Sequence, residues 1–155
     1  MQIQTDDPER ADVLALLEEH LRHMHALSPP ESVHALDPKK LKTPDITFWT
    51  ARDADGLLLG TGALRELDET HGEVKSMRTP DALRRRGAGR AMLVHIVEEA
   101  RRRGYARLSL ETGSQDGFAP ARRLYASAGF VPCGPFGDYT DDPNSAFMTL
   151  ALTTP

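Results

Sequence analysis

The stretch between positions 77 and 90 carries residue types that are suited to hold a phosphate group. It contains the pair Gly87 and Gly89, and arginines border this pair on both sides. These arginines are Arg84, Arg85, Arg86 and Arg90. Glycines let the backbone come close to a ligand, and the free amides that begin a helix attract an anion. Arginine side chains complement phosphate charge. The segment therefore predicts a pyrophosphate cradle, and the structural alternative is a tight turn.

Two other phosphate-binding loops fit the sequence poorly. A Walker loop needs Gly-Lys-Ser/Thr, which the chain does not contain. A dinucleotide-binding fingerprint needs a small residue at the position of Met92 and should open an early parallel strand-helix-strand unit. Here the loop follows a run of predicted hairpin strands in the middle of the chain. We therefore expect a small polyanionic ligand of another kind.

Hydrophobic spacing predicts the elements that position this loop. A helix is expected over 89–103, because its apolar residues recur at helical spacing and Gly104 follows as a C-cap. Helices are also expected over 11–24 and 119–128. The first of these has one apolar face, which comprises Val13, Leu14, Leu17, Leu21 and Met24. Strands are expected over 46–52, 57–67, 73–79, 107–112, 130–131 and 147–152, with turns at 53–56 and 69–72.

This order of elements predicts a single domain over residues 1–155. Its class is α/β (α+β), with a mixed, mostly antiparallel central sheet flanked by helices. A chain of 155 residues with 39% apolar and 27% charged residues can bury a core without a metal or a disulfide. The single cysteine, Cys133, excludes an intrachain disulfide and a multi-cysteine zinc site.

Charge and hydropathy exclude further classes of protein. The chain has 19 Lys+Arg against 23 Asp+Glu, and this net charge of -4 argues against a general nucleic-acid binder. It has no apolar run of the ~18–20 residues that a membrane span needs, and its N-terminus lacks the pattern of a signal peptide. We therefore expect a cytoplasmic protein without a nucleic-acid or membrane partner.

Two motifs together resemble the GNAT N-acetyltransferase superfamily. Arg84-x-x-Gly87-x-Gly89 after a strand is similar to its acetyl-CoA pyrophosphate loop, and the segment 121–130, Ala-Arg-Arg-Leu-Tyr-Ala-Ser-Ala-Gly-Phe, is similar to its second motif. The pair is more specific than either motif alone, and with the element order it covers roughly the whole chain. Segments 73–79, 108–113 and 134–139 resemble a bacterial subgroup labelled indole-acetic-acid acetyltransferase, a label that does not identify the acceptor.

The resemblance implies a GNAT-like acyl-CoA N-acyltransferase fold with acetyl-CoA as cosubstrate and no metal. Backbone groups of Met77, Arg78 and Thr79 would contact the pantetheine arm. The following loop would hold the pyrophosphate. Its cofactor-binding residues are Arg84, Arg85, Arg86, Gly87, Ala88, Gly89 and Arg90. Phe118 stands where many relatives carry an asparagine that contacts pantetheine, so this chain departs from the family there.

The resemblance also implies catalytic roles for Tyr125 and Glu73. Tyr125 would protonate the departing CoA thiolate, since a hydroxyl with a pKa near ~10 keeps its proton at neutral pH. The alternative is a tyrosine that packs its helix against the sheet. Glu73 lies four residues before Met77, which is the spacing of the glutamate base in histone acetyltransferases of this superfamily. Glu111 on the neighbouring strand and a water molecule are open alternatives for the base.

The expected reaction is direct attack of a small-molecule amine on acetyl-CoA. A protein or peptide amine as acceptor, and a non-catalytic acyl-CoA sensor, are the alternatives. The resemblance implies that the first helix and its loop form the wall of the acceptor site. The residues expected there are His23, His25, Pro29, Pro30, Glu31, Ser32 and His34. The first helix also carries His20, but no recognisable metal site is completed. A homodimer is an open alternative, with 136–139 as a candidate contact.

Overall fold

A computed structural model describes residues 1–34, 37–84 and 86–152 of the chain. The described residues form one seven-stranded sheet, three α-helices and four short 3-10 turns. The strands are β1 (Gln2–Thr5), β2 (Ile46–Arg52), β3 (Leu58–Asp68), β4 (His71–Arg78), β5 (Arg107–Gly113), β6 (Val131–Cys133) and β7 (Ser145–Ala151). The α-helices are α1 (Ala11–Leu27), α2 (Ala88–Arg102) and α3 (Ala119–Ser127). The 3-10 turns are η1 (Pro30–Ser32), η2 (Lys40–Lys42), η3 (Asp81–Leu83) and η4 (Asp116–Phe118).

The sheet is mixed and mostly antiparallel, as the sequence predicted. Its strand order is β1-β2-β3-β4-β5-β7-β6, and β4 and β5 are its parallel pair. The other neighbouring strands run antiparallel. The connection between β4 and β5 contains the predicted phosphate loop and α2, as a parallel pair requires a crossover. No helix among the described residues is long and apolar enough to cross a membrane.

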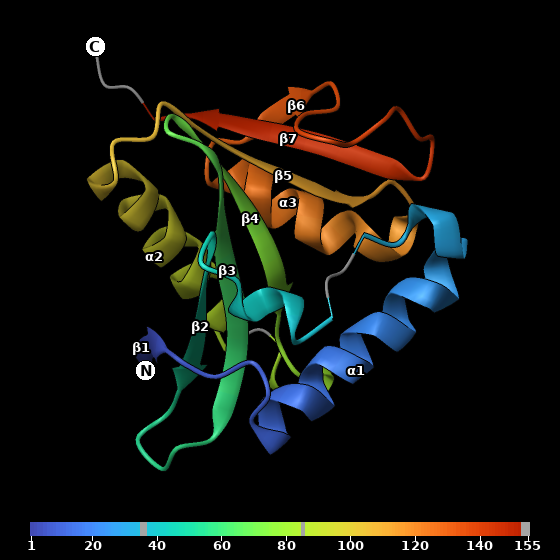
Figure 1. The fold of residues 1–155 in the computed structure, drawn as a ribbon. Helices are drawn as coiled ribbons and strands as arrows, with labels where there is room; N and C mark the ends of the chain where they lie inside the picture. The colour runs from blue at the N-terminus through green and yellow to red at the C-terminus, as the bar shows by residue number, and fades with distance from the viewer. Residues whose placement is uncertain (35–36, 85, 153–155) are drawn as a thin grey trace.

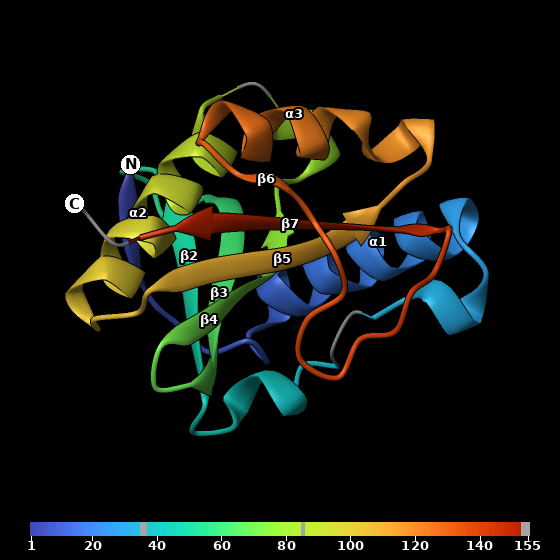
Figure 2. The same cartoon turned by 90° about the horizontal axis from the view of Figure 1, so that it is seen from above.

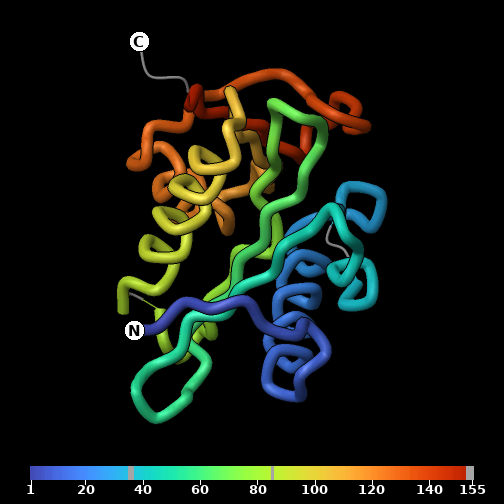
Figure 3. Tube along the Cα trace, turned by 60° about the vertical axis from the view of Figure 1, so that its left-hand side comes forward, coloured from blue at the N-terminus to red at the C-terminus, as the bar shows by residue number. Residues whose placement is uncertain are grey.

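Helices cover both faces of the sheet. Figures 1, 2 and 3 show α2 and α3 over one face and α1 over the other. The α2 face holds the larger core, in which Met92, Leu93 and Ile96 are almost fully buried. Gly62 of β3 lets α2 lie close, because a Cβ at this position would lie 2.5 Å from Met92 Cγ.

The helix α1 differs from the expectation in its apolar face. Val13 and Leu16 are its buried residues, and they pack on a smaller core with Leu41 and Phe48. Most of the expected stripe lines a cleft, and Leu17 of this stripe also packs against the smaller core. These cleft residues are Leu14, Leu17, Leu21 and Met24. The helix therefore has two apolar faces, and it continues to Leu27, three residues beyond the predicted end.

Strand boundaries also differ from the prediction, and β7, for example, begins at Ser145 and not at 147. The strand β4 begins at His71, inside the expected turn, because the Asp68 side chain closes the turn by accepting a hydrogen bond from the Thr70 amide (2.8 Å). Cys133 lies in β6 and not in a loop. In the candidate dimer-contact loop, Phe136 is buried, with 8% of its surface exposed.

The sheet is disrupted at β4 in two ways. Pairing between β4 and β5 ends at Glu73 and Ser109, and beyond these residues the two strands fan apart (Figure 1). On the other side of β4, Ser76 and Met77 together face Gly62 of β3, which makes a β-bulge. Ser76 has a φ of 56°, a left-handed conformation that is uncommon for a residue with a side chain.

Candidate active site

A cleft of about 760 Å³ lies where β4 and β5 separate. It extends from the glycine-arginine loop at the start of α2 to α1 and the loop that precedes β7. Every predicted cofactor-binding residue that the structure describes lines this cleft. These residues are Met77, Arg78, Thr79, Arg84, Arg86, Gly87, Ala88, Gly89 and Arg90. Arg85 lies outside the described residues.

The loop presents the start of α2 to the cleft. Gly87 is the N-cap residue, its φ of 83° suits glycine, and no side chain caps the helix. The amide of Ala91 bonds to the Gly87 carbonyl (3.0 Å), so the amides of the preceding turn have no partner within the helix. Uncapped amides at the positive end of a helix can bind an anion.

The arginines of the loop differ in their surroundings. Arg84, half exposed, pairs with Asp81 (Nη2 to Oδ1, 2.7 Å). Arg90 donates a hydrogen bond to Ser127 Oγ (3.1 Å) on α3. The Arg78 side chain is only 9% exposed, and it bonds to Glu19 of α1 (3.4 Å) and to Asp81 (3.2 Å). Arg78 therefore holds α1 against the loop, which leaves its backbone as the part that can contact a ligand.

Glu73 lies at the point of the split and is almost fully buried, with 1% of its surface exposed. Its Oε2 accepts hydrogen bonds from Tyr139 Oη (2.6 Å) and Lys75 Nζ (3.3 Å). Lys75 Nζ also donates to Tyr139 Oη (3.1 Å). This network joins β4 to the loop before β7, and sequence spacing did not reveal it.

Glu111 stands on β5 across the split and lines the same cleft. Burial raises the pKa of its carboxyl from the ordinary 4.5 to about 7, and Lys75 opposes that rise while Glu73 adds to it. Near pH 7 the Glu111 carboxyl therefore exchanges its proton readily, as a general base must. The combination of a cleft, a facing carboxylate and a shifted pKa is typical of catalytic sites.

Tyr125 points from α3 into the cleft while most of its ring is buried. The ring packs edge-on against Phe130, with 6.0 Å between the ring centroids. Burial raises the pKa of its hydroxyl, and the nearby charge of Glu111 raises it further. Tyr125 therefore keeps its proton at neutral pH. The ring therefore packs as the alternative described, and protonation of the thiolate by Tyr125 stays a prediction.

Part of the expected acceptor wall lines the cleft. His23 and His34 do, and His20, which was not among the expected wall residues, lines it as well. Burial lowers the pKa of all three rings, to about 4 for His20. The other expected wall residues are absent from the lining. These are His25, Pro29, Pro30, Glu31 and Ser32. In the part of the chain that the structure describes, no group of histidine, cysteine and acidic residues could hold a metal ion.

Ser32 does not line the cleft and is bonded instead to the loop before β7. Its Oγ donates to Asp142 Oδ2 (2.6 Å), and Asn144 Nδ2 donates to the same Oγ (3.4 Å). The contact joins the segment after α1 to the loop before β7. Tyr139 of that loop also packs edge-on against His34, with 5.1 Å between ring centroids. The one sequence signal for Tyr139 was the resemblance of segment 134–139.

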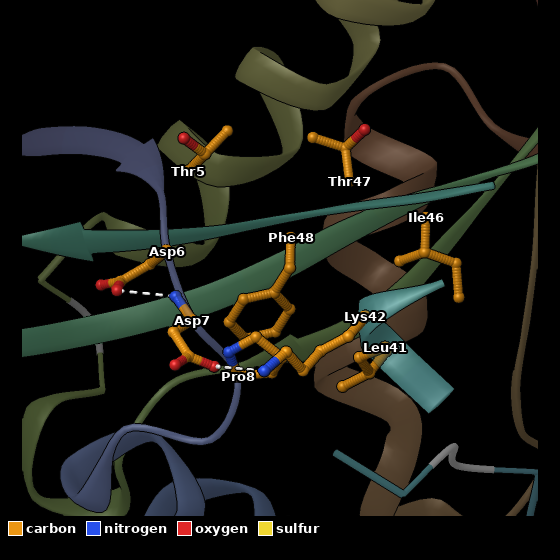
Figure 4. Close-up of a pocket in the computed structure, with 9 residues that line it drawn as sticks. All are labelled: Thr5, Asp6, Asp7, Pro8, Leu41, Lys42, Ile46, Thr47 and Phe48. Carbon is orange, nitrogen blue, oxygen red and sulfur yellow. Dashed lines mark hydrogen bonds and ion pairs between the residues drawn. The ribbon is translucent and has the colours of Figure 1, made fainter. Parts of the chain in front are cut away.

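A second hollow, of about 540 Å³, lies between the start of α1 and strand β2 (Figure 4). Its polar contacts are those of a surface loop. The Asp7 amide donates to Asp6 Oδ1 (2.8 Å), and Lys42 Nζ lies 3.7 Å from Asp7 Oδ1. The predicted catalytic and cofactor-binding residues that the structure describes lie in the larger cleft, and none of these lines the hollow.

Comparison with known proteins assigns a family. Residues 13–130 match the model of the acetyltransferase (GNAT) family. The chain is 55% identical over 152 residues to uncharacterized N-acetyltransferase YsnE of Bacillus subtilis, covering 98% of this chain and 100% of that protein. It is 40% identical over 151 residues to IAA acetyltransferase of Azospirillum brasilense, covering 97% of each. A crystal structure from Klebsiella pneumoniae, described as an acyl-CoA N-acyltransferase, matches with a TM-score of 0.80 at 26% identity, covering 98% of this chain and 97% of that one.

Proposed function

The chain belongs to the acetyltransferase (GNAT) family, and from this premise we propose that it moves the acetyl group of acetyl-CoA to the amine of a small-molecule acceptor. The observation that carries the proposal is a single cleft with an uncapped helix start at one end and two acidic side chains, Glu73 and Glu111, at the other. The uncapped helix start suits a pyrophosphate, and the acidic side chains suit removal of a proton from an amine.

The split sheet supports binding of the pantetheine arm along β4. From Val74 onward, β4 has no β5 partner, so its backbone groups on that side are free of ladder hydrogen bonds. An extended ligand that carries amide groups can pair with such an edge as an additional strand does. Met77, Arg78 and Thr79 would provide these contacts, and Arg84, Arg86 and the first-turn amides of α2 would bind the phosphates.

In the proposed reaction the acceptor nitrogen attacks the thioester carbonyl directly. The new N–C bond forms as the C–S bond breaks, and the nitrogen loses a proton. Glu111 is the favoured proton acceptor, because its pKa of about 7 suits the task. Glu73 has its Oε2 occupied by Tyr139 and Lys75. In this proposal Glu73 acts in the active site as a positioning residue, because it holds the side chains of Tyr139 and Lys75 in place.

Tyr125 would stabilise the sulfur that leaves. Its raised pKa means that full proton transfer to a thiolate, whose conjugate acid has an ordinary pKa near ~8.5, is uphill. A hydrogen bond from the hydroxyl to the developing thiolate needs no such transfer and strengthens as charge accumulates on the sulfur. The proton that CoA finally carries would then come from solvent.

Hydrogen bonds between the segment after α1 and the loop before β7 support a small acceptor over a peptide. The contact between Ser32 and Asp142 joins two loops across this end, and Ser28, Gln115 and Asn144 extend the same connection. An extended peptide would need an open groove at this point. The relative named IAA acetyltransferase is in keeping with a small-molecule substrate.

Calorimetric titration of acetyl-CoA into the wild type and into Gly89→Glu tests this function. A Cβ at Gly89 meets Leu124 at an ordinary 3.5 Å, so Gly89→Ala should keep binding. Glutamate at the same position adds a negative charge where the pyrophosphate should lie, and should abolish binding. Val94→Glu adds the same charge on the exposed side of α2 and serves as the matched control.

Tight binding that Gly89→Glu loses and Val94→Glu keeps would support the cofactor assignment. If the folded wild type does not bind acetyl-CoA at about 1 mM, which corresponds to a free energy near -4 kcal/mol, the proposed function fails. Binding without CoA release on any amine would favour the acyl-CoA sensor. Circular dichroism of each variant shows whether the fold is intact.

A further inference from the structure

The acceptor end of the cleft contains a buried cation, Lys75. Its side chain is 8% exposed, and its Nζ lies 3.1 Å from Tyr139 Oη and 3.3 Å from Glu73 Oε2. An ammonium group has three N–H donors. These two contacts therefore leave one donor for the cleft that Lys75 lines.

The groups around Lys75 determine which part of an acceptor it can bind. His34, which faces it from the segment after α1, is neutral at pH 7, because burial and then the charge of Lys75 lower its pKa. Glu73 already neutralises Lys75, and Glu111 faces both from β5. A carboxylate on the acceptor would accept the remaining N–H of Lys75, and an amine next to that carboxylate would face the carboxyl of Glu111.

The opposite wall of the same end is apolar. It is formed by the second apolar face of α1, and one of its residues, Leu21, is 39% exposed. Phe118 continues this wall, and His23 packs edge-on against it with 5.7 Å between ring centroids. Apolar side chains left open inside a cleft indicate an apolar group on the ligand.

We propose that the acceptor is an α-amino acid with an apolar side chain, whose carboxylate pairs with Lys75 and whose amine faces Glu111. The side chain would lie against the apolar face of α1. This inference rests on the proposed acetyl transfer and narrows its substrate class. The product is the N-acetyl amino acid, formed with release of CoA, and the proton lost by the amine passes to Glu111.

Matched pairs of acceptors test the inference in the wild type. L-phenylalanine is compared with 2-phenylethylamine, and L-leucine with 3-methylbutylamine, at saturating acetyl-CoA, with CoA release measured by chromatography. We expect kcat/KM to be about 10- to 100-fold higher for each amino acid, the range of a hydrogen bond to a charged group. L-phenylalanine amide, which lacks the carboxylate charge, should behave like the amine.

A variant of Lys75 tests whether this side chain causes the preference for amino acids over amines. Lys75→Met should lower kcat/KM about 10- to 100-fold more for L-phenylalanine than for 2-phenylethylamine, so that the preference for the amino acid is lost. Lys75→Arg, which keeps the charge, should retain part of the preference. Lys40→Met, at an exposed position of η2, is the control and should change neither rate. If Lys75→Met does not fold, the wild-type comparison still decides.

Two results would overturn the inference. One is equal or faster turnover of the amines that lack a carboxylate. The other is no turnover of any apolar amino acid although calorimetry shows bound acetyl-CoA. Absence of acetyl-CoA binding to the wild type is a different result, because it refutes the proposed function itself.

Discussion

Replacement of Glu111 by glutamine should stabilise the protein, and the gain should depend on pH. In the folded chain the pKa of Glu111 is raised to about 7 from an ordinary 4.5, chiefly by burial. The folded state therefore holds this proton more tightly than the unfolded state. Stability contributed by this group is highest below pH 4.5 and falls as the pH rises from 4.5 to 7. Glutamine is neutral at every pH, so Glu111→Gln does not lose stability in this way as the pH rises.

The size of the effect follows from the size of the pKa rise. One pKa unit corresponds to about 1.4 kcal/mol, so the rise amounts to about 3 kcal/mol for a fully developed effect. The Glu111 side chain is only partly buried, and screening by water reduces the expected gain to about 1–3 kcal/mol at pH 8. At pH 4.5, where both side chains are neutral, wild type and Glu111→Gln should be nearly equal.

Urea unfolding at pH 4.5 and pH 8, followed by circular dichroism, measures this difference. Glu98→Gln replaces an exposed glutamate on α2 and should give no pH-dependent change. A second arm measures acetyl transfer with an accepted amine, where Glu111→Gln should lower kcat about 100-fold. A stability difference that is the same at both pH values would refute the burial argument. Full activity in Glu111→Gln would refute the role as base.

Three shorter predictions concern other parts of the site and the fold. Tyr125→Phe should lower kcat about 10-fold or more in steady-state kinetics, while calorimetry shows nearly unchanged binding of acetyl-CoA. Gly87→Ala, at a φ of 83° with nothing within 4 Å of the new Cβ, should cost about 1–2 kcal/mol of backbone strain and lower Tm by a few degrees. Asp6 accepts hydrogen bonds from Thr50 (2.7 Å) and Arg52 (3.2 Å), and although burial opposes it, these bonds lower its pKa. Asp6→Asn should therefore cost about 1–3 kcal/mol in urea unfolding at pH 7, with a smaller loss below the ordinary pKa of 3.8.

The sequence predicted those helices and strands that are defined by residues within the helix or strand or directly next to it. The strand over 46–52 and the helix after Gly87 were expected within one residue of their observed bounds, because apolar spacing and turn residues define both. The phosphate loop was expected for the same reason, since its glycines and arginines are neighbours in sequence. All its described residues line the cleft.

The network at the other end of the cleft could not be predicted in this way. Tyr139 contacts Glu73 across 66 positions of sequence, and no spacing rule connects a loop residue to a strand that distant. For a related reason, the sequence predicted one apolar face for α1 where the structure has two. Leu14 and Leu17 fit a buried stripe by periodicity, but the cleft lies where a core would otherwise continue. The position of such a residue in the fold, and not its periodicity, decides whether it packs in the core or lines a binding surface.

The bulge in β4 lies between Glu73 and the cofactor contacts proposed at 77–79, and it gives a last prediction. Ser76 holds a φ of 56°, fixed in part by Thr61, whose Oγ1 donates to the Ser76 carbonyl (2.7 Å). Strain of this kind persists where the surrounding structure enforces it, and it is found at functional sites. Glycine tolerates a positive φ, whereas valine does not.

Ser76→Gly should therefore change the free energy of unfolding by less than about 1 kcal/mol, because relief of strain and the greater freedom of unfolded glycine oppose each other. Ser76→Val should cost about 1–3 kcal/mol and should weaken acetyl-CoA binding, since a shifted bulge moves Met77 out of line with the cleft. Calorimetry and urea unfolding on both variants separate the two effects. If Ser76→Val loses stability but binds acetyl-CoA as tightly as Ser76→Gly, the bulge serves the fold alone and does not position the cofactor.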